Sequence, residues 1–336
     1  MKVNQTFVSY SRTCMRYDLN IGYLIVQGGI EHYEACFLTV IMSAKELFQQ
    51  VLEEVRQDVK ILQEEKGVTP GLAAILVGDD PVSQVYVSLK EKDCGKVGIK
   101  STVYKMFDYP PETRNKKVLD LITKLNNDPE THGILIQLPF PNFVDKEKVF
   151  ETLSPQKDAD GLTPHNMGKL LLGEYSMESG LIPCTPKGSM TILDYFGIDV
   201  AGKDAIIVGR SALVGEPLRK LLQDRNATVT CTHRKTKNLL ERLRKADIVV
   251  AAAGRPPELY QDNAFRLSAD MVKEGVIVIS IGVRRDPATG KLVFDVDFEE
   301  VKEKAGYITP NTGSTGIMTR GMLLKNTISA AKSLTS

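Results

Sequence analysis

The feature that most constrains the fold is a regular alternation of short apolar segments with longer amphipathic ones. Residues 71–78, GLAAILVG, and residues 133–141, GILIQLPFP, are nearly all apolar, which is typical of strands buried on both faces of a parallel sheet. Amphipathic segments of helical length separate such runs. The alternation predicts an α/β fold with mainly parallel sheets and right-handed crossovers. Further strands are predicted at 204–209, 227–232, 247–254 and 276–283.

The predicted order begins at Met42. Ser43 and Glu46 have the spacing of a capping box, and an apolar stripe at helical spacing follows them. Residues 1–41 show no such periodicity. We therefore expect them to be an extension outside the fold, or an upstream misreading of the gene.

Length, charge and cysteine pattern exclude several classes of protein. The chain has 336 residues, which suggests about two domains, and a net charge of +1, which gives no overall attraction to nucleic acid or an acidic membrane. No apolar run reaches the length of a membrane span, about eighteen residues. The five cysteines form no CxxC pair and the four histidines no ligand spacing, which argues against a disulfide framework and a metal site. A cytoplasmic, reducing environment fits this pattern best.

A glycine-containing turn follows the predicted strand at 204–209. The turn reads GRSALVGEP, residues 209–217, and its spacing is not GxGxxG. Gly209 and Gly215 would let backbone amides approach a pyrophosphate at a helix N-terminus, but the pattern is equally typical of a plain tight turn. Both interpretations stay open on this motif alone.

The next predicted strand ends in basic residues. In dinucleotide folds an acid at this place binds the ribose 2′-OH of NAD, whereas a basic residue suits the 2′-phosphate of NADP. His233, Arg234 and Lys235 stand here, and Arg210 lies in the glycine turn. They form either a solvated basic edge or a phosphate clamp, since arginine donates paired hydrogen bonds to phosphate. We favour the clamp, and therefore NADP, with NAD still possible.

Polar residues interrupt apolar surroundings in the first half of the chain. Gln137 lies in a predicted buried strand, where an amide without partners would cost about 1–3 kcal/mol. Either it bonds backbone groups locally, or it points out of the carboxyl end of the strand, where α/β proteins bind ligands. Asp158 and Asp160 precede a glycine, which is also typical of a plain turn. Residues 182–188, IPCTPKG, indicate a proline-bracketed connection at a domain junction.

Six motifs taken together resemble one known family. In chain order they are PVSQVYVSLKEKDCGKVGI, GILIQLPFP, SPQKDADGLTPHNMGKL, IPCTPKG, VGRSALVGEP and YITP…GMLLKNT. The chain is thereby similar, from about Ser43 to its C-terminus, to the bifunctional methylenetetrahydrofolate dehydrogenase/cyclohydrolase family. The resemblance implies two α/β domains with a cleft between them, generally in a homodimer. We expect the catalytic domain at 42–185, completed by a C-terminal helix at 319–336, and a Rossmann-like NAD(P)-binding domain at 186–318.

The resemblance implies two reactions in one cleft. Methylenetetrahydrofolate is oxidised to the methenyl form with NADP or NAD, and the methenyl cation is hydrolysed to 10-formyltetrahydrofolate. The family's Tyr-x-x-x-Lys pair falls on Tyr86 and Lys90, its glutamine on Gln137, and its folate-binding aspartate on Asp160. Lys90 would carry the proton in the hydrolysis, which requires a pKa near neutrality, and Gln137 would tune it without adding negative charge.

Further contacts are implied around these catalytic residues. Folate contacts are expected from Ser83, Tyr86, Gln137, Asp160 and Gly313. Cofactor contacts are expected from Thr185, Gly209, Arg210, Ser211, Gly215, His233, Arg234, Gly254 and Gly282. No metal is expected.

Departures from the family pattern lie in loops expected to face the nicotinamide. The usual PVPGGVGPMT reads PNTGSTGIMT at 310–319, and Ser280 replaces the usual aspartate of DVGIN. Because proline fixes backbone shape, the loss of two prolines is predicted to loosen the loop. Three alternatives to a bifunctional enzyme therefore stay open: a cyclohydrolase with weak or lost dehydrogenase activity, a non-catalytic folate- or nucleotide-binding protein, and a dehydrogenase for an unrelated substrate.

Overall fold

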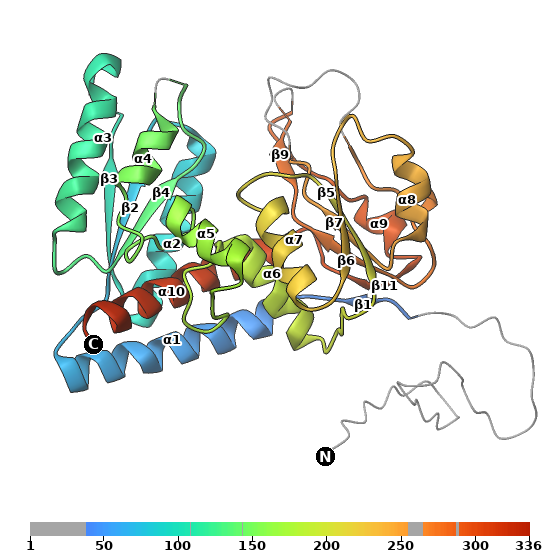
Figure 1. The fold of residues 1–336 in the computed structure, drawn as a ribbon, viewed down its shortest axis with the longest axis horizontal. Helices are drawn as coiled ribbons and strands as arrows, with labels where there is room; N and C mark the ends of the chain where they lie inside the picture. The colour runs from blue at the N-terminus through green and yellow to red at the C-terminus, as the bar shows by residue number, and fades with distance from the viewer. Residues whose placement is uncertain (1–37, 108, 143, 255–264, 287–288) are drawn as a thin grey trace, which may run out of the picture.

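The computed structural model describes residues 38–107, 109–142, 144–254, 265–286 and 289–336. Within these residues the strands form two parallel sheets, which lie side by side in Figure 1, and one antiparallel pair. The first sheet, in the order β3-β2-β4, contains β2 (Gly71–Leu76), β3 (Lys100–Lys105) and β4 (Gly133–Gln137). The second, in the order β1-β11-β8-β7-β5-β6, contains β1 (Val40–Ile41), β5 (Asp204–Val208), β6 (Thr228–Thr232), β7 (Ile248–Ala251), β8 (Val276–Ser280) and β11 (Ala305–Ile308). The antiparallel pair is β9 (Val283–Arg285) with β10 (Leu292–Phe294).

Helices connect the strands and cover the sheets. The first half contains α1 (Lys45–Lys66), α2 (Pro81–Val97), α3 (Pro111–Asn126), α4 (Lys146–Thr152) and α5 (Pro164–Leu172). The second half contains α6 (Cys184–Tyr195), α7 (Gly215–Asp224), α8 (Leu239–Lys245), a 3-10 turn η2 (Ala269–Met271), α9 (Phe298–Val301) and α10 (Thr315–Leu334). The predicted α/β class is confirmed.

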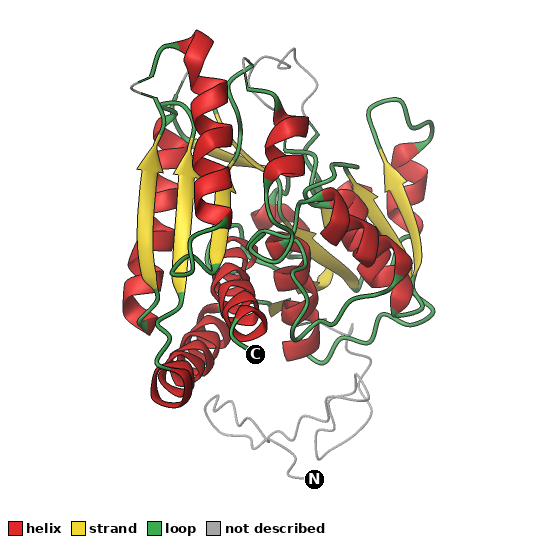
Figure 2. Cartoon of the chain, turned by 60° about the vertical axis from the view of Figure 1, so that its left-hand side comes forward, coloured by secondary structure: helices red, strands yellow, loops and turns green. Residues whose placement is uncertain are grey.

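The first sheet is buried on both faces, as its apolar sequence predicts. Figure 2 shows its strands side by side, with helices against them. Ala73 and Ile75 belong to one hydrophobic cluster with α3 and α4, whereas Leu72 and Ala74 belong to another with α1 and α10. Gln137 is the last residue of β4, so it lies at the carboxyl edge of this sheet.

The second sheet is covered in the same way. Ile206 and Val249 cluster with α8 and α9, whereas Ala205 and Val250 cluster with α6 and α7. Its strands are parallel within the described residues. The loops that follow β5, β6, β7 and β8 therefore all lie at the carboxyl edge of the sheet. α/β proteins bind ligands at this edge.

One helix, α10, packs against both halves of the molecule. Its buried residues Met318, Met322 and Ile328 share a hydrophobic cluster with β2 of the first sheet and β5 of the second. Figure 1 shows α10 lying along α1 and reaching α6. The helix begins at Thr315, one turn before the predicted start at Thr319.

The fold begins earlier than the predicted start at Met42. Val40–Ile41 pair with β11 at the edge of the second sheet. The prediction that residues 1–41 lie outside the fold is therefore wrong for 39–41, since Thr39 Oγ1 also donates a 2.7 Å hydrogen bond to Ala305 O. Residues 1–37 lie outside the described part of the chain. A strand of two residues has no periodicity that a sequence pattern can detect.

The predicted capping box ahead of α1 does not form. Ala44 is the N-cap of α1, and no side chain caps the helix. Instead the backbone amide of Ala44 donates a 3.0 Å hydrogen bond to Gly313 O, and that of Ser43 donates one of 2.8 Å to Ile41 O. The start of α1 is thus bonded to the loop that precedes α10, which local sequence does not reveal.

The segment 182–188 is mainly helix rather than the predicted connection. α6 begins at Cys184, with Pro183 as its N-cap. Pro186 falls in the first turn, where backbone amides have no partner within the helix, so its missing N–H removes no bond. As a consequence Thr185 lies at a helix N-terminus, beside the cleft described below.

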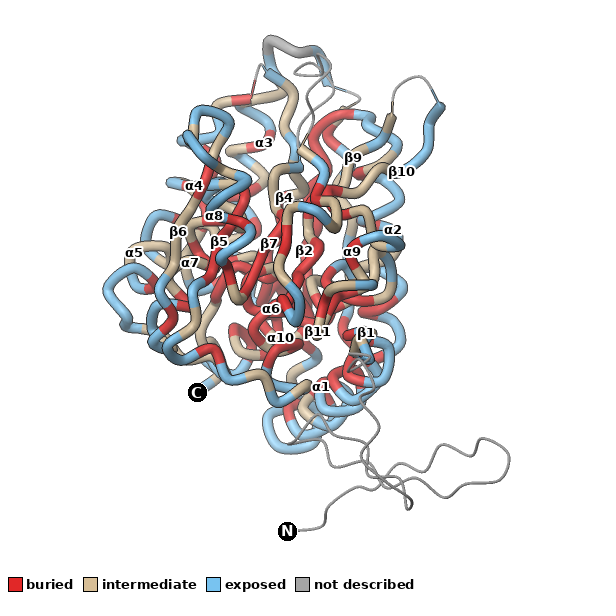
Figure 3. Tube along the Cα trace, turned by 90° about the vertical axis from the view of Figure 1, so that its right-hand side faces the viewer, coloured by how far each residue is buried: buried red, intermediate tan, exposed pale blue. Residues whose placement is uncertain are grey.

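Burial follows the layers of the fold. Figure 3 shows β2 and β7 buried, while the outer side of α1 is exposed. No helix in the described part of the chain is long and apolar enough to span a membrane.

Candidate active site

Local sequence explains why Lys90 lies on a helix. Asp80 is the N-cap of α2, and its carboxylate accepts a 2.7 Å hydrogen bond from Ser83 N. Pro81 occupies the first helical position, and Gly98 ends the helix with a left-handed φ of 83°. Lys90 lies midway between these ends.

Lys90 and Gln137 are in direct contact. Lys90 Nζ donates a 3.0 Å hydrogen bond to Gln137 Oε1. Gln137 Nε2 donates a 2.6 Å hydrogen bond to Leu138 O, which orients the amide so that its oxygen faces the lysine. The two interpretations of Gln137, a local hydrogen bond or a side chain directed at a ligand site, are therefore compatible. The side chain bonds a local backbone group and also points out of the carboxyl end of β4.

Lys90 and Gln137 line a cavity of about 150 Å³ with Asp160 and Thr185. Its remaining lining residues are Leu135, Ile136, Leu138, Leu162, Cys184, Leu213, Val214 and Thr319. The lining thus combines β4, α2, α6 and α10 with the glycine turn that follows β5. The structure brings together four predicted residues that are far apart in the sequence.

Burial controls the charges at this cavity. Desolvation lowers the pKa of the Lys90 amine, while Asp160 opposes this shift and Arg320 adds to it. Burial likewise raises the pKa of the Asp160 carboxyl, and Lys90 opposes that shift. Burial also raises the pKa of the Cys184 thiol well above its usual range, so this thiol stays neutral. Perturbed titratable groups that converge in one cavity are typical of a functional site.

The two neighbouring aspartates have different surroundings. Asp158 is buried, and its Oδ2 accepts hydrogen bonds from Thr163 N at 2.7 Å and Asn166 Nδ2 at 2.9 Å. The turn interpretation therefore fits Asp158. Asp160, by contrast, lines the cavity.

Three other predicted folate contacts lie outside the lining of this cavity. Ser83 is buried near the start of α2. Tyr86 lies one turn before Lys90 and is 37% exposed. Gly313 has a left-handed φ of 77° in the loop before α10, where its carbonyl accepts the hydrogen bond from Ala44.

Most of the predicted cofactor residues gather at the carboxyl edge of the second sheet. Gly209, Arg210 and Ser211 follow β5, and His233 and Arg234 follow the adjacent β6. Arg210 and Arg234 are exposed, whereas the His233 ring is turned toward its own loop, with Nδ1 accepting a 3.2 Å hydrogen bond from Lys235 N.

Glycines allow the close backbone packing at this sheet edge that the binding of a dinucleotide requires. Gly209 has φ of 133°, and a Cβ there would lie 2.3 Å from Ala252 O. A Cβ on Gly215 would lie 2.7 Å from Gly209 O, so the turn closes tightly against the first residue of α7. The exposed turn at this helix N-terminus and the neighbouring arginines fit the pyrophosphate and 2′-phosphate of NADP.

Gly254 and Gly282 lie side by side at the ends of β7 and β8. A Cβ on Gly254 would be 3.6 Å from Gly282 Cα. Asp295 is packed against both, since its Oδ2 accepts a 2.9 Å hydrogen bond from Gly254 N and would be 1.7 Å from a Cβ on Gly282. Only glycine fits at position 282 without movement of Asp295.

The altered loop at 310–319 is held by hydroxyl groups. Thr315 Oγ1 donates a 2.8 Å hydrogen bond to Ser280 O, and Ser314 Oγ donates one of 2.8 Å to Met42 O. Ser280 Oγ donates to Asn311 Oδ1 at 3.0 Å. The prediction of a loosened loop considered only the lost prolines, whereas these bonds restrain the same segment in another way.

Sequence patterns did not single out the remaining lining residues, among them Thr319, Leu213 and Val214. Thr319 Oγ1 lies 3.0 Å from Thr185 Oγ1, and Leu213 and Val214 bring the glycine turn to the cavity. A polar residue at the start of a predicted helix was the available signal for Thr319. No local signal distinguishes the two apolar residues.

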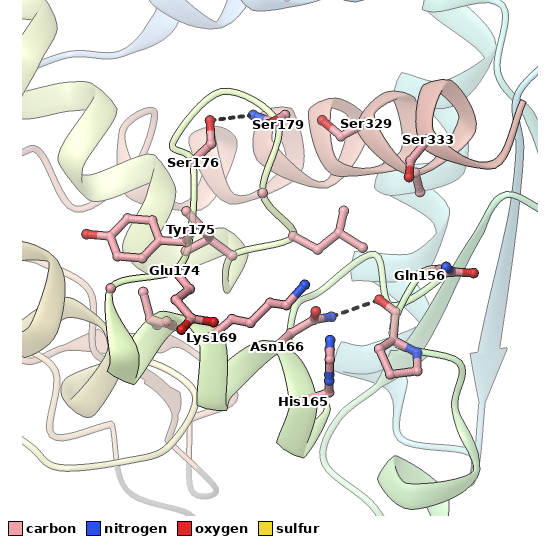
Figure 4. A pocket seen from close by; sticks show the side chains of 17 residues that line it. Gln156, His165, Asn166, Lys169, Glu174, Tyr175, Ser176, Ser179, Ser329 and Ser333 are labelled. Carbon is pink, nitrogen blue, oxygen red and sulfur yellow. Dashed lines mark hydrogen bonds between the residues drawn. The ribbon is translucent and has the colours of Figure 1, made fainter. Parts of the chain in front are cut away.

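A larger cavity, of about 520 Å³, lies between α5, the segment 173–182 and α10 (Figure 4). Polar groups in its wall bond to one another: Asn166 Nδ2 donates to Pro155 O at 2.9 Å, and Ser179 N donates to Ser176 Oγ at 3.2 Å. None of the predicted site residues is among its described lining residues. The smaller cavity is therefore the better candidate for the active site, although the other cavity has the larger volume.

The fold and the site define a two-domain α/β protein in which a nucleotide-type sheet edge meets a cavity lined by Lys90, Gln137 and Asp160. The family model of the tetrahydrofolate dehydrogenase/cyclohydrolase catalytic domain matches residues 42–160, and that of the NAD(P)-binding domain matches 183–335. The chain belongs to the tetrahydrofolate dehydrogenase/cyclohydrolase family, which confirms the resemblance seen in the sequence.

Individual relatives are similar over nearly their whole length. The bifunctional protein FolD of Pyrobaculum calidifontis is 48% identical over 294 residues, which cover 86% of this chain and 95% of the relative. That of Moorella thermoacetica is 45% identical, with 87% and 98% covered.

Solved structures agree with these relatives. The bifunctional FolD dehydrogenase/cyclohydrolase of Campylobacter jejuni has a TM-score of 0.79 and 44% identity, and covers 88% of this chain and 99% of its own. The Trypanosoma brucei enzyme, complexed with NADP cofactor and inhibitor, has a TM-score of 0.78 and 32% identity, with 88% and 98% covered.

Proposed function

We propose that this protein oxidises 5,10-methylenetetrahydrofolate to the 5,10-methenyl form with NADP and hydrolyses the product to 10-formyltetrahydrofolate. The observation that carries the proposal is the hydrogen bond between Lys90 Nζ and Gln137 Oε1, at 3.0 Å, in the cavity where the glycine turn meets the first domain. Family membership and relatives named as bifunctional enzymes support both activities.

The hydrolysis needs proton transfer between the attacking water, Lys90 and the departing ring nitrogen. A buried amine with a lowered pKa has a neutral fraction that accepts a proton from water and returns it as the ring opens. Gln137 positions that amine without a negative charge that would raise its pKa. We assign Asp160 to hydrogen bonding of the pterin ring and Tyr86, exposed on the same helix, to packing against the substrate.

The residues at the second sheet edge are proposed to hold NADP, whose bound nicotinamide supplies the oxidising chemistry of the first step. Arg210 and Arg234 would bind the 2′-phosphate as charge-assisted donors. Gly209, Ser211 and Gly215 would receive the pyrophosphate at the N-terminus of α7. We place Thr185, His233, Gly254, Gly282 and Gly313 around the same ligands.

We further propose a catalytic domain at 42–185, completed by 319–336, and an NAD(P)-binding domain at 186–318. The packing of α10 against α1 and the first sheet supports this division. A homodimer in the cytoplasm is proposed from the family resemblance and from the unpaired pattern of cysteines in the sequence.

One assay tests the function. Purified protein is supplied with methylenetetrahydrofolate and NADP, then with NAD, and methenyl formation and decay are followed by absorbance. We expect formation followed by enzymatic decay, faster with NADP. Accumulation without decay, decay of added methenyl compound without its formation, or neither would each contradict part of the proposal.

A further inference from the structure

A buried ion pair lies one helical turn beyond Lys90. Asp93, on the same helix, has a side chain that is 2% exposed. Its Oδ2 lies 2.8 Å from Arg320 Nε and its Oδ1 lies 2.8 Å from Lys96 Nζ. The Arg320 side chain is 15% exposed, whereas that of Lys96 is 55% exposed. Asp93 therefore has one buried and one solvated cationic partner.

Arg320 is held in place from two sides. It follows Thr319, which lines the catalytic cavity, in the second turn of α10. Its guanidinium carbon lies 5.5 Å from the centre of the Phe48 ring, a cation–π distance, and its Nε lies 2.8 Å from Asp93 Oδ2. This arrangement joins α10 to the helix that carries Lys90.

The titratable groups facing Lys90 come from several elements. Asp160 approaches from the segment between α4 and α5, Cys184 from α6, Cys94 from α2 and Arg320 from α10. Asp160 favours the protonated lysine, and Arg320 disfavours it. Asp93, three residues from Lys90 on α2, is a further carboxylate whose charge Arg320 balances inside the protein, where screening by water is weak.

We propose that Arg320 is a positioning residue for Lys90: paired with Asp93, it holds α10 against α2 and cancels the negative charge one turn beyond the lysine. The inference rests on the proposed hydrolase function of Lys90. The ion pair thus limits the negative charge near the amine and favours its role as a proton acceptor. A purely structural pair would stabilise the two helices without setting the pH dependence of the reaction.

Breaking the pair from either side separates these roles. Arg320→Met leaves the negative charge of Asp93 less balanced, which favours protonated Lys90. The acid limb of the pH profile, where the hydrolysis rate falls as Lys90 becomes protonated, should therefore move to higher pH. Asp93→Asn leaves the positive charge of Arg320 unbalanced, so the same acid limb should move to lower pH. Each shift should be about half a pH unit or more. The double variant should return toward the midpoint of the wild type.

The measurement is the pH profile of methenyltetrahydrofolate hydrolysis, with the non-enzymatic rate subtracted. Lys325→Met is the matched control, because it breaks an ion pair between α10 and α1, 2.7 Å from Lys325 Nζ to Glu54 Oε2, away from the cavity. It should leave the midpoint unchanged. Arg320→Lys, which keeps the charge, should retain the midpoint of the wild type. If Arg320→Met does not fold, Arg320→Gln, which also removes the charge, replaces it in the comparison with Asp93→Asn.

Opposite shifts from the two sides support the inference. Unchanged midpoints, or shifts in the same direction, in an active hydrolase would overturn it while leaving the proposed function intact. Absence of hydrolysis in the wild-type protein would instead contradict the proposed function itself.

Discussion

Lys90 is a basic side chain whose burial makes its neutral form more accessible than that of a solvated lysine. Burial lowers its pKa, and the bond from Nζ to Gln137 Oε1 holds it without adding charge. A lysine of this kind releases its proton more readily than a solvated lysine does. At the residue scale the proposed hydrolysis would therefore depend on one amine and on the groups that lower its pKa.

Replacement of Lys90 by methionine should abolish the hydrolysis and leave the oxidation active. The expected loss of the hydrolysis rate is about 10²–10⁴-fold, the usual contribution of general acid–base catalysis. Methenyl compound should then accumulate in the absorbance assay. Lys92→Met, at an exposed position two residues on, is the control and should behave as the wild type. Near-normal hydrolysis by Lys90→Met would rule out the assignment.

Arg234 should determine the preference for NADP over NAD. Arg234→Ala removes one charge-assisted donor to a phosphate, so KM for NADP should rise about 10–100-fold. The kcat/KM with NAD, which has no 2′-phosphate, should change little. Arg242→Ala, an exposed position on α8, serves as the control. An equal loss with both cofactors would show that Arg234 does not read the 2′-phosphate.

At the element scale, the loop before α10 illustrates how one type of restraint replaces another. Family members restrain this loop with prolines and glycines. Here Ser280 and Thr315 tie it to the end of β8, and Ser314 ties it to Met42 ahead of α1. The loop is thereby bonded to segments from both ends of the chain, a restraint that inspection of 310–319 alone does not reveal.

Removal of these hydroxyls should affect the oxidation more than the hydrolysis. The double variant Ser280→Ala, Thr315→Val deletes two side-chain hydrogen bonds, each worth roughly 1 kcal/mol, so dehydrogenase kcat/KM should fall about tenfold. Hydrolysis, which we assign to Lys90, should stay within about twofold of the wild-type rate. Parallel losses of both activities would indicate general unfolding rather than loosening of this loop.

At the scale of the whole molecule, a buried polar network connects the two halves behind the cavity. Lys187, 1% exposed on α6, donates hydrogen bonds to Asn326 Oδ1 at 2.9 Å and Gly180 O at 3.0 Å. Asn326 Nδ2, on α10, donates at 2.9 Å to both Ala159 O and Ile182 O. The network holds the segment before Asp160 and the segment before α6 on the same helix.

Lys187 should make stability depend on pH. Burial lowers the pKa of its ammonium group from the usual 10.5 to about 8. Between these values the unfolded chain holds a proton that the folded chain has released, so rising pH disfavours unfolding. This group should add about 2–3 kcal/mol to the unfolding free energy between about pH 7.5 and pH 10.

Denaturant unfolding of the wild type and of Lys187→Met at both pH values isolates this contribution. The unfolding free energy of Lys187→Met should lack this additional increase between the two pH values, whatever its absolute value at either pH. The same pH dependence in both proteins would contradict the buried, proton-releasing lysine.

Hydrophobic periodicity was sufficient to predict most of the fold. β2, β4, β5, β7 and β8 are buried on both faces and therefore read as short apolar runs, and α1 and α3 present one apolar stripe. The sequence patterns missed β1, β11, the hairpin β9–β10 and the helices α4, α5, α8 and α9. Most of these elements are too short for a period to emerge, and several of their partners lie far away in the chain.

The sequence by itself determined the α/β class, the family and the identity of Lys90, Gln137 and Asp160 as candidates, because residue type and order are local properties. Only the tertiary structure decided that these three side chains share one cavity, that Thr319 and Val214 close it, and that Arg320 pairs with Asp93. The charge state of Lys90 is likewise decided only by the tertiary structure. Its pKa depends on burial and on groups from α6, α10 and the segment between α4 and α5, which approach it only when the chain is folded.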